Sequence, residues 1–375
     1  REARKVWKDA DAAIAPAQAV CDILTAARIE GAPLPFDFTR WEEEKDYVFG
    51  GKEHTAALGI LKGMNPLHFP CAFPEVFLRE REGFDVILGN PPWEEAMADE
   101  DAFWARYFPG LRAFPARDKK QAIVQLSHER PDLAAVLTTE VADASKMRKT
   151  LNRGPFPGMG TGDADLYKAF CWRFWFLAAE AGGRIGVVLP RSVLAAKGSE
   201  EFRWTLFKEA DLADLTILLN KSRWAFDMEP RYTVALVTIQ RGSSLETEVR
   251  LTGPYNSRSA YESRREHGGA SFSGEEIMSW TKPASLPLLP APQSGEVFSQ
   301  LRKSPSLNLD DADQWRARPH RELDATNDAA LMDFDSKECP EGFWVIYKGS
   351  SFDIWEPDTG DYYAWGDPEL LTRSL

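Results

Sequence analysis

The chain has 375 residues, 43% hydrophobic and 27% charged, and a formal net charge of −13 at pH 7. This length can hold two domains with sizeable cores, and we expect no stretch apolar and long enough to span a membrane and no secretory signal. The acidic balance argues against a simple DNA-binding module, because phosphate contacts need Lys and Arg. A DNA enzyme is still allowed, because binding uses one local cleft rather than the average surface.

The chain begins with Arg1 rather than Met and ends within an aromatic segment, so we expect a piece of a longer protein. Its four cysteines form no C-x-x-C pair, so zinc clusters, other metal sites and a disulfide framework are not expected. A cytoplasmic location is the default for such a chain. Residues 1–80 are expected to form a mostly helical lead-in segment, with one helix over residues 10–27.

The most informative run is Phe-Asp-Val-Ile-Leu-Gly-Asn-Pro-Pro-Trp at residues 84–93. Residues 85–88 are typical of a strand buried on both faces of a parallel sheet. Gly89 and two prolines, which lack backbone N–H groups, end the strand pairing at Asn90. The pattern predicts a rigid polar loop at the carboxyl end of a central strand, where open α/β sheets bind ligands.

Such a tetrad is suited to binding an amine. A side-chain oxygen of Asn90 and a backbone carbonyl, held rigid by Pro91 and Pro92, can accept both hydrogens of an exocyclic amine and aim its lone pair at a methyl donor. Trp93 offers a flat face on which a flipped base can stack. The alternative is a proline-rich turn in which Trp93 fills the core.

The rest of the chain predicts an α/β sheet followed by a second region. Residues 94–160 are expected to be a helical insertion that ends in a glycine-rich hinge or linker, and residues 81–241 to be the catalytic half of one domain. Helices at 165–181 and 200–210 alternate with strands at 184–190, 212–219 and 232–240. Residues 242–293 are expected to be a linker of weak structure, and residues 294–375 the start of another domain, with an aromatic hairpin over 343–365.

Asn90-Pro91-Pro92-Trp93 resembles the (N/D/S)-P-P-(Y/F/W) motif of amino-methyltransferases. The runs at residues 166–170, 183–190 and 231–237 follow it in the order of motifs IV to VIII of gamma-class N6-adenine DNA methyltransferases. Those enzymes occur in restriction-modification and related phage-defence systems. The strip at 68–77 resembles their lead-in to motif IV, and residues 348–355 resemble the start of their target-recognition domain.

This resemblance implies a partial Rossmann-like sheet that uses S-adenosylmethionine as cofactor. It implies double-stranded DNA as partner, with a nuclease or other defence-system subunits, and no membrane. Asn90 and the Pro91 carbonyl would hold the adenine amine beside the cofactor, and Trp93 would stack on the flipped base. Phe226, or else Trp224, would stack on its other face. An ordinary core role is the alternative for either residue.

One feature of the family is not visible before residue 84: the glycine-rich cofactor motif. Residues 48–51 are a poor substitute, because no acidic residue follows a clear strand at the ribose-binding distance. We therefore expect this motif to precede Arg1. Two other functions stay open: methylation of RNA or of a protein glutamine amide, and a degenerate methyltransferase fold that serves as a DNA-binding scaffold. A basic cluster at residues 315–321 predicts either phosphate contacts or a solvated loop.

Overall fold

The structure is a computed structural model. It describes residues 2–35, 39, 43, 48–242, 246–264, 269–289, 294–305, 317, 323–325 and 327–374. The chain divides into two compact units, Arg1–Leu301 and Arg302–Leu375. Most of the predicted basic cluster at 315–321 lies outside the described residues.

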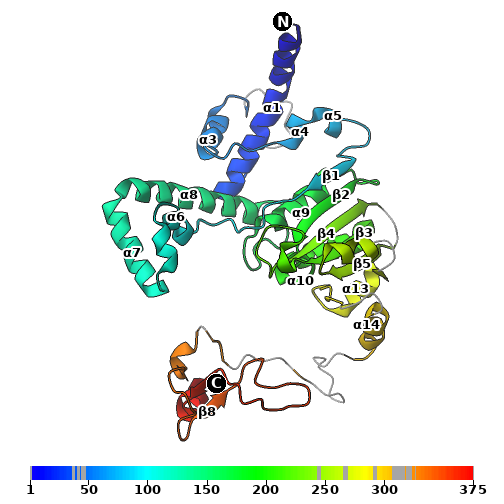
Figure 1. The fold of residues 1–375 in the computed structure, drawn as a ribbon. Helices are drawn as coiled ribbons and strands as arrows, with labels where there is room; N and C mark the ends of the chain where they lie inside the picture. The colour runs from blue at the N-terminus through cyan, green and yellow to red at the C-terminus, as the bar shows by residue number, and fades with distance from the viewer. Residues whose placement is uncertain are drawn as a thin grey trace. The chain divides into compact units, whose positions relative to one another are not determined.

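The first unit is built on a six-stranded mixed sheet with the strand order β1-β2-β4-β3-β5-β6 (Figure 1). Its strands are β1 (Val86–Gly89), β2 (Arg184–Pro190), β3 (Ala210–Leu219), β4 (Thr233–Arg241), β5 (Glu248–Tyr255) and β6 (Gly269–Ser273). β1 runs parallel to β2 and β3 parallel to β5, whereas β4 is antiparallel to both of its neighbours and β6 to β5. The predicted α/β class is therefore confirmed, and the strands predicted at 184–190, 212–219 and 232–240 are present.

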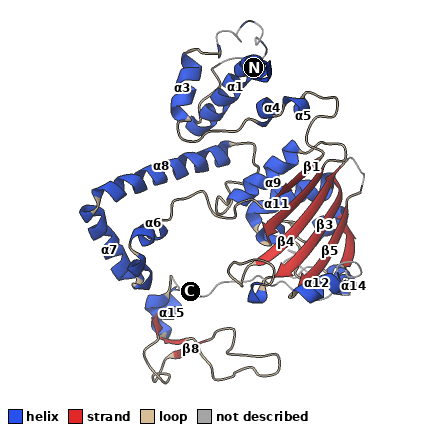
Figure 2. Ribbon diagram, turned by 45° about the horizontal axis from the view of Figure 1, so that its top comes forward, coloured by secondary structure: helices blue, strands red, loops and turns tan. Residues whose placement is uncertain are grey.

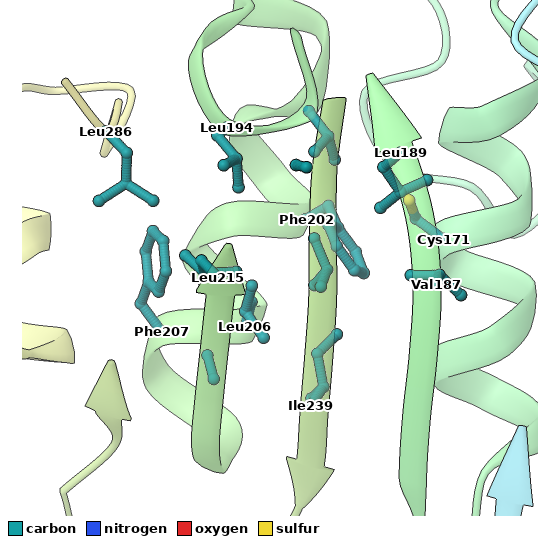
Figure 3. Packing of buried hydrophobic residues seen from close by; sticks show 14 of the residues in the cluster. Cys171, Val187, Leu189, Leu194, Phe202, Leu206, Phe207, Leu215, Ile239 and Leu286 are labelled. Atoms are coloured by element: carbon teal, nitrogen blue, oxygen red, sulfur yellow. The ribbon is translucent and has the colours of Figure 1, made fainter. Parts of the chain in front are cut away.

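One face of the sheet is covered by helices that connect its strands (Figure 2). They are α9 (Leu166–Leu177), α10 (Ser192–Ala195), the short 3-10 helix η3 (Lys197–Ser199) and α11 (Glu200–Glu209). Side chains alternate between the faces along each strand, so Val187 and Leu189 of β2 point to these helices, as Figure 3 shows. They pack there against Cys171 of α9 and Phe202 of α11. This apolar layer is the main core of the protein.

The sequence placed residues 85–88 in a strand buried on both faces, and this prediction is wrong. Within the described residues β1 pairs only with β2, so it is an edge strand. Val86 and Leu88 are 57% and 80% exposed, because they point to the sheet face opposite α9. An apolar run shows which side chains can be buried, and the presence of covering elements decides which of them are.

The prediction of a weakly structured linker over residues 242–293 is also wrong. This region contains β5, α12 (Arg258–Arg264), β6 and α13 (Gly274–Trp280). In β5, Val249 and Leu251 alternate with Glu248 and Arg250, and only the apolar pair points into the core. The polar side chains of these strands lie on the sheet face opposite α9. Because they are numerous, the composition of the region resembles that of a linker.

The segment 94–160, predicted to be a helical insertion, is largely helical. Its helices are α6 (Glu100–Tyr107), the 3-10 helix η2 (Pro109–Ala113), α7 (Ala116–Glu129) and α8 (Pro131–Arg153). They have a core of their own, in which Phe103 and Trp104 are fully buried. The segment after α8 does not form the free hinge or linker that its glycines suggested: Met159 is buried and Trp172 Nε1 donates to the carbonyl oxygen of Pro157 at 2.9 Å.

The N-terminal residues are helical, as predicted. The helices are α1 (Glu2–Glu30), α3 (Lys52–Ile60), α4 (Phe69–Ala72) and α5 (Pro74–Phe77). Contrary to expectation, residues 8–30 of α1 are long and apolar enough to span a membrane by length and composition. Core helices of soluble proteins meet the same criterion, and Val20, Ile23 and Ala26 of α1 pack in a buried cluster with α3.

The second unit follows the helix α14 (Ser294–Arg302). It contains a three-stranded antiparallel sheet in the order β7-β9-β8. Its elements are the 3-10 helix η5 (Ala329–Leu331), β7 (Met332–Asp333), β8 (Trp344–Ile346), β9 (Ala364–Gly366) and α15 (Pro368–Ser374). β8 and β9 are the two strands predicted for the aromatic hairpin, and Ile346, Ala364 and Leu371 form a small core around them.

Candidate substrate-binding site

The Asn90–Trp93 loop lies at the edge of the sheet where the parallel strands have their carboxyl ends. Asn90 follows β1, Arg191 follows β2 and Asn220 follows β3. These ends meet because β1 is parallel to β2, and β2 and β3 are both antiparallel to β4. Polar side chains that directly follow such strands are therefore brought to one edge, which is where open α/β sheets bind ligands.

The backbone on both sides of the loop is held in place. A Cβ atom at Gly89 would lie 3.1 Å from Cζ of Phe174, so a side chain here would press on α9. After the loop, Ala96 N donates to the carbonyl oxygen of Ala164 at 3.0 Å, and Leu166 N donates to that of Glu94 at 2.9 Å. The insertion therefore leaves and rejoins the sheet domain at one point, and the loop keeps a defined position despite the long excursion.

Asn90 is exposed and its side chain forms no hydrogen bond with any residue that the structure describes. Pro91 is buried behind it and Pro92 is half-buried. Because the prolines fix the backbone dihedral φ, the backbone that carries the carbonyl of Pro91 and the side chain of Asn90 has little freedom to move. The loop thus presents unengaged hydrogen-bonding groups from a rigid backbone.

Trp93 is half-buried and packs against two apolar clusters. One is the main core, and the other is the aromatic cluster around Leu218, Val234 and Tyr255. Its ring meets that of Tyr232 edge-on, with centroids 6.4 Å apart and an interplanar angle of 71°. Its Nε1 is buried and lacks a hydrogen-bond partner among the described residues. Tyr232 was not predicted as a site residue, although its position directly before a buried strand could have indicated it.

Phe226 and Trp224 pack against the same aromatic cluster as Trp93. The structure therefore brings together the aromatic residues that the sequence proposed for base stacking. They lie on the loop between β3 and β4, which includes the 3-10 helix η4 (Lys221–Arg223). Trp224 is anchored through Nε1, which donates to the carbonyl oxygen of Leu219 at 2.8 Å.

Asn220 organises this loop and was missed by sequence reasoning. Its side chain is fully buried. Its Nδ2 donates to the carbonyl oxygen of Phe226 at 2.8 Å, and its Oδ1 accepts from the backbone N–H groups of Ala225 and Phe226 at 3.3 and 3.1 Å. The only signal in the sequence is a polar residue directly after an apolar strand.

The charged groups near this edge are mixed in sign. Arg223 pairs with Asp227 at 3.2 Å and Arg231 with Glu229 at 3.0 Å. Among the described residues, Lys221 has no ion pair, so its positive charge is available to an anion. A local cationic group therefore exists at this edge in spite of the acidic total.

The described residues do not form a cradle for S-adenosylmethionine. No glycine-rich strand-turn-helix precedes β1 among them: Gly51 stands at the N-terminus of α3, with extended backbone and no strand before it in the described residues. No strand in the described part of the chain pairs with the edge of β1 away from β2, and Leu88 beside this edge is exposed. The residues present thus fit the binding of an amine at Asn90 and do not fit the cofactor.

No protein-family model and no curated protein matches the chain. Among solved structures, it is similar to a modification subunit of a putative type I restriction enzyme from Vibrio vulnificus, with 16% identity over 60% of this chain and 42% of that one and a TM-score of 0.33. It is also similar to DrdV in complex with DNA, with 14% identity over 48% of this chain and 16% of that one and a TM-score of 0.30. A third similar structure is the type IIG restriction endonuclease BpuSI, with 16% identity over 64% of this chain and 26% of that one and a TM-score of 0.25. The chain spans less than half of each, and similarity this distant assigns no function.

Proposed function

We propose that the chain carries the substrate-holding side of a site-specific DNA methyltransferase, which transfers a methyl group from S-adenosylmethionine to the N6 amine of a flipped adenine. The enzyme would be of the gamma class and act in a restriction-modification or related phage-defence system. The observation that carries this proposal is the Asn90–Trp93 loop, rigid and unengaged at the carboxyl end of β1, beside the aromatic cluster. In this proposal the six-stranded sheet is part of a Rossmann-like methyltransferase sheet.

The amine is the difficult reactant, because its lone pair is delocalised into the adenine ring. Oδ1 of Asn90 accepts one amine hydrogen and the carbonyl oxygen of Pro91 accepts the other. These two acceptors turn the nitrogen lone pair toward the methyl donor and stabilise the positive charge that develops on nitrogen. No strong general base is needed, because the methylated amine is acidic enough to lose its proton afterwards.

The flipped base needs an apolar surface to replace its stacking in the duplex. Trp93 provides one ring and Phe226 the other, since both pack around Leu218, Val234 and Tyr255. Asn220 acts as a positioning residue, because it holds the backbone of Phe226. Lys221, on the same loop, supplies a positive charge for a backbone phosphate of the DNA.

Methyl transfer from labelled S-adenosylmethionine tests the proposal. The chain is incubated with unmethylated duplex DNA, RNA or a glutamine-containing protein, at millimolar cofactor to offset weak binding. We expect label in adenine of the DNA only. Asn90→Ala should abolish transfer and leave DNA binding unchanged, whereas Asn152→Ala, an exposed asparagine on α8, should change neither.

Each contrary result points to a different function. Label in RNA or protein would show that one of these, and not DNA, is the substrate. Unchanged transfer by Asn90→Ala would show that the loop is not the catalytic site. DNA binding with no transfer to any acceptor, at a cofactor concentration at which calorimetry shows S-adenosylmethionine bound to the chain, would favour a scaffold role over an enzyme.

A further inference from the structure

A cavity of about 400 Å³ lies within the first unit, between α1, α4, α8 and α9. Its wall is formed by side chains of these helices and by the segments 64–68 and 154–156. None of residues 90–93 lines it, so it is separate from the substrate-holding loop. Its volume is within the range of pockets that bind small molecules, about 300–1,000 Å³.

The wall of this cavity is largely aromatic. Phe69, Phe156, Phe170 and Phe174 line it, together with methionine, leucine and proline side chains. Phe170 and Phe174 are neighbours on α9, with ring centroids 5.7 Å apart and an interplanar angle of 51°. Such a wall favours a ligand with a flat apolar body.

Two guanidinium groups interrupt this apolar wall, those of Arg28 on α1 and Arg173 on α9. Among the residues that the structure describes, no acidic residue lines the cavity, and neither arginine side chain forms an ion pair or a hydrogen bond. Arg173 lies over the ring of Phe156, with its Cζ 5.4 Å from the ring centroid. Burial lowers the pKa of Arg173, and the positive charge of Arg28 lowers it further.

This arrangement differs from that of the neighbouring Arg153. Nη1 of Arg153 donates to the carbonyl oxygen of Ile29 at 2.6 Å, so that guanidinium is satisfied by the backbone. Arg28 and Arg173, both half-buried, instead bring two like charges to one largely apolar cavity with no acidic residue among the described residues of its wall, which is unfavourable for the chain alone. An anion between them would offset both the repulsion and the lost hydration.

We propose that this cavity binds a small aromatic anion, with its carboxylate, phosphate or sulfonate between the guanidinium groups of Arg28 and Arg173 and its ring against the phenylalanines. Guanidinium forks match the geometry of such oxyanions, and charge-assisted hydrogen bonds are the strong ones. The ring displaces water from an apolar wall, which adds to binding.

A pair of fluorescent probes tests the proposal on the full chain. 8-Anilinonaphthalene-1-sulfonate is an aromatic anion, and N-phenyl-1-naphthylamine has the same rings without the sulfonate. We expect one saturable site for the anion. Arg28→Gln and, independently, Arg173→Gln should weaken binding of the anion by about tenfold, the loss of one charge-assisted contact, and leave binding of the neutral probe within about twofold. Arg112→Gln, an exposed arginine on η2, is the matched control and should change neither.

Several outcomes would overturn the inference. Equal binding of the anion to both variants and to the wild type would make the cavity a plain apolar surface. A parallel loss of affinity for both probes would show that the arginines do not act through their charge. Displacement of the anion by a short DNA duplex would assign the two arginines to a nucleic-acid surface instead. Circular dichroism verifies the fold of each variant, and because either arginine suffices for the test, misfolding of one leaves the other decisive.

Discussion

The side chain of Asn220 binds the backbone of Phe226 on both sides, with Nδ2 at 2.8 Å from its carbonyl oxygen and Oδ1 at 3.1 Å from its nitrogen. A fully buried amide thus takes the place of regular secondary structure in the loop after β3. Ser222 and Arg223 in this loop have positive φ, a backbone conformation that is unfavourable for residues other than glycine.

Replacing this amide should loosen the loop. Asn220→Ala leaves the carbonyl and the N–H groups at 225 and 226 without partners, so the free energy of unfolding should fall by about 2–3 kcal/mol. Urea unfolding measures the loss, and hydrogen exchange should show faster exchange of the amides of Ala225 and Phe226. Asn152→Ala is the control. Unchanged exchange at these two amides would show that the network does not hold the loop.

Trp93 should tolerate Phe better than its size suggests. Its buried Nε1 has no partner among the described residues, and Trp93→Phe removes this unsatisfied donor. We expect Trp93→Phe to lower the free energy of unfolding by less than about 1 kcal/mol and Trp93→Ala by about 3 kcal/mol. Equal losses in urea unfolding would contradict this account of the ring. In the proposed function only the Phe variant keeps a face for the base.

Leu88 and Leu189 should respond differently to substitution, although the sequence predicts a strand around each of them. Leu88 is 80% exposed and Leu189 fully buried, although both stand in apolar strands. Leu88→Gln should change the free energy of unfolding by less than about 0.5 kcal/mol, and Leu189→Ala should lower it by about 3 kcal/mol. Thermal or urea unfolding gives both values. A loss above about 2 kcal/mol for Leu88→Gln would mean that this face is covered in solution.

The chain should bind S-adenosylmethionine weakly or not at all, because the described residues form no cofactor cradle beside β1. Isothermal titration calorimetry should give a dissociation constant weaker than about 1 mM. A complete gamma-class methyltransferase serves as the positive control. Micromolar binding by these 375 residues would disprove the expectation.

The cysteines should differ in reactivity. Burial raises the pKa of Cys171 strongly and that of Cys21 to about 11, so both stay protonated and unreactive at pH 8. Cys339 is exposed. Iodoacetamide at pH 8, followed by peptide mass spectrometry, should modify Cys339 first and Cys171 last. Raising the pH toward 11 should speed modification of Cys21, because its thiolate then forms; early labelling of Cys171 would contradict its burial.

The sequence by itself determined the α/β class, the strands β2, β3 and β4, and the position of a polar loop directly after β1. These features depend on short-range patterns: runs of apolar β-branched residues, helical periodicity and prolines that cannot continue a ladder. It also singled out Trp93 and Phe226, which the fold then brings to one aromatic cluster.

Only the tertiary structure decided what each apolar or polar run meets. The alternating residues of β5 form a strand because they pair with β3. Val86 and Leu88 are exposed because β1 lies at the edge of the described sheet. The roles of Asn220 and Tyr232 depend on the path of one loop and on contacts between residues far apart in the chain, and so does the presence of both Arg28 and Arg173 in the wall of one cavity. A local pattern fixes the character of a side chain, whereas its burial and its partners depend on which distant segments pack against it.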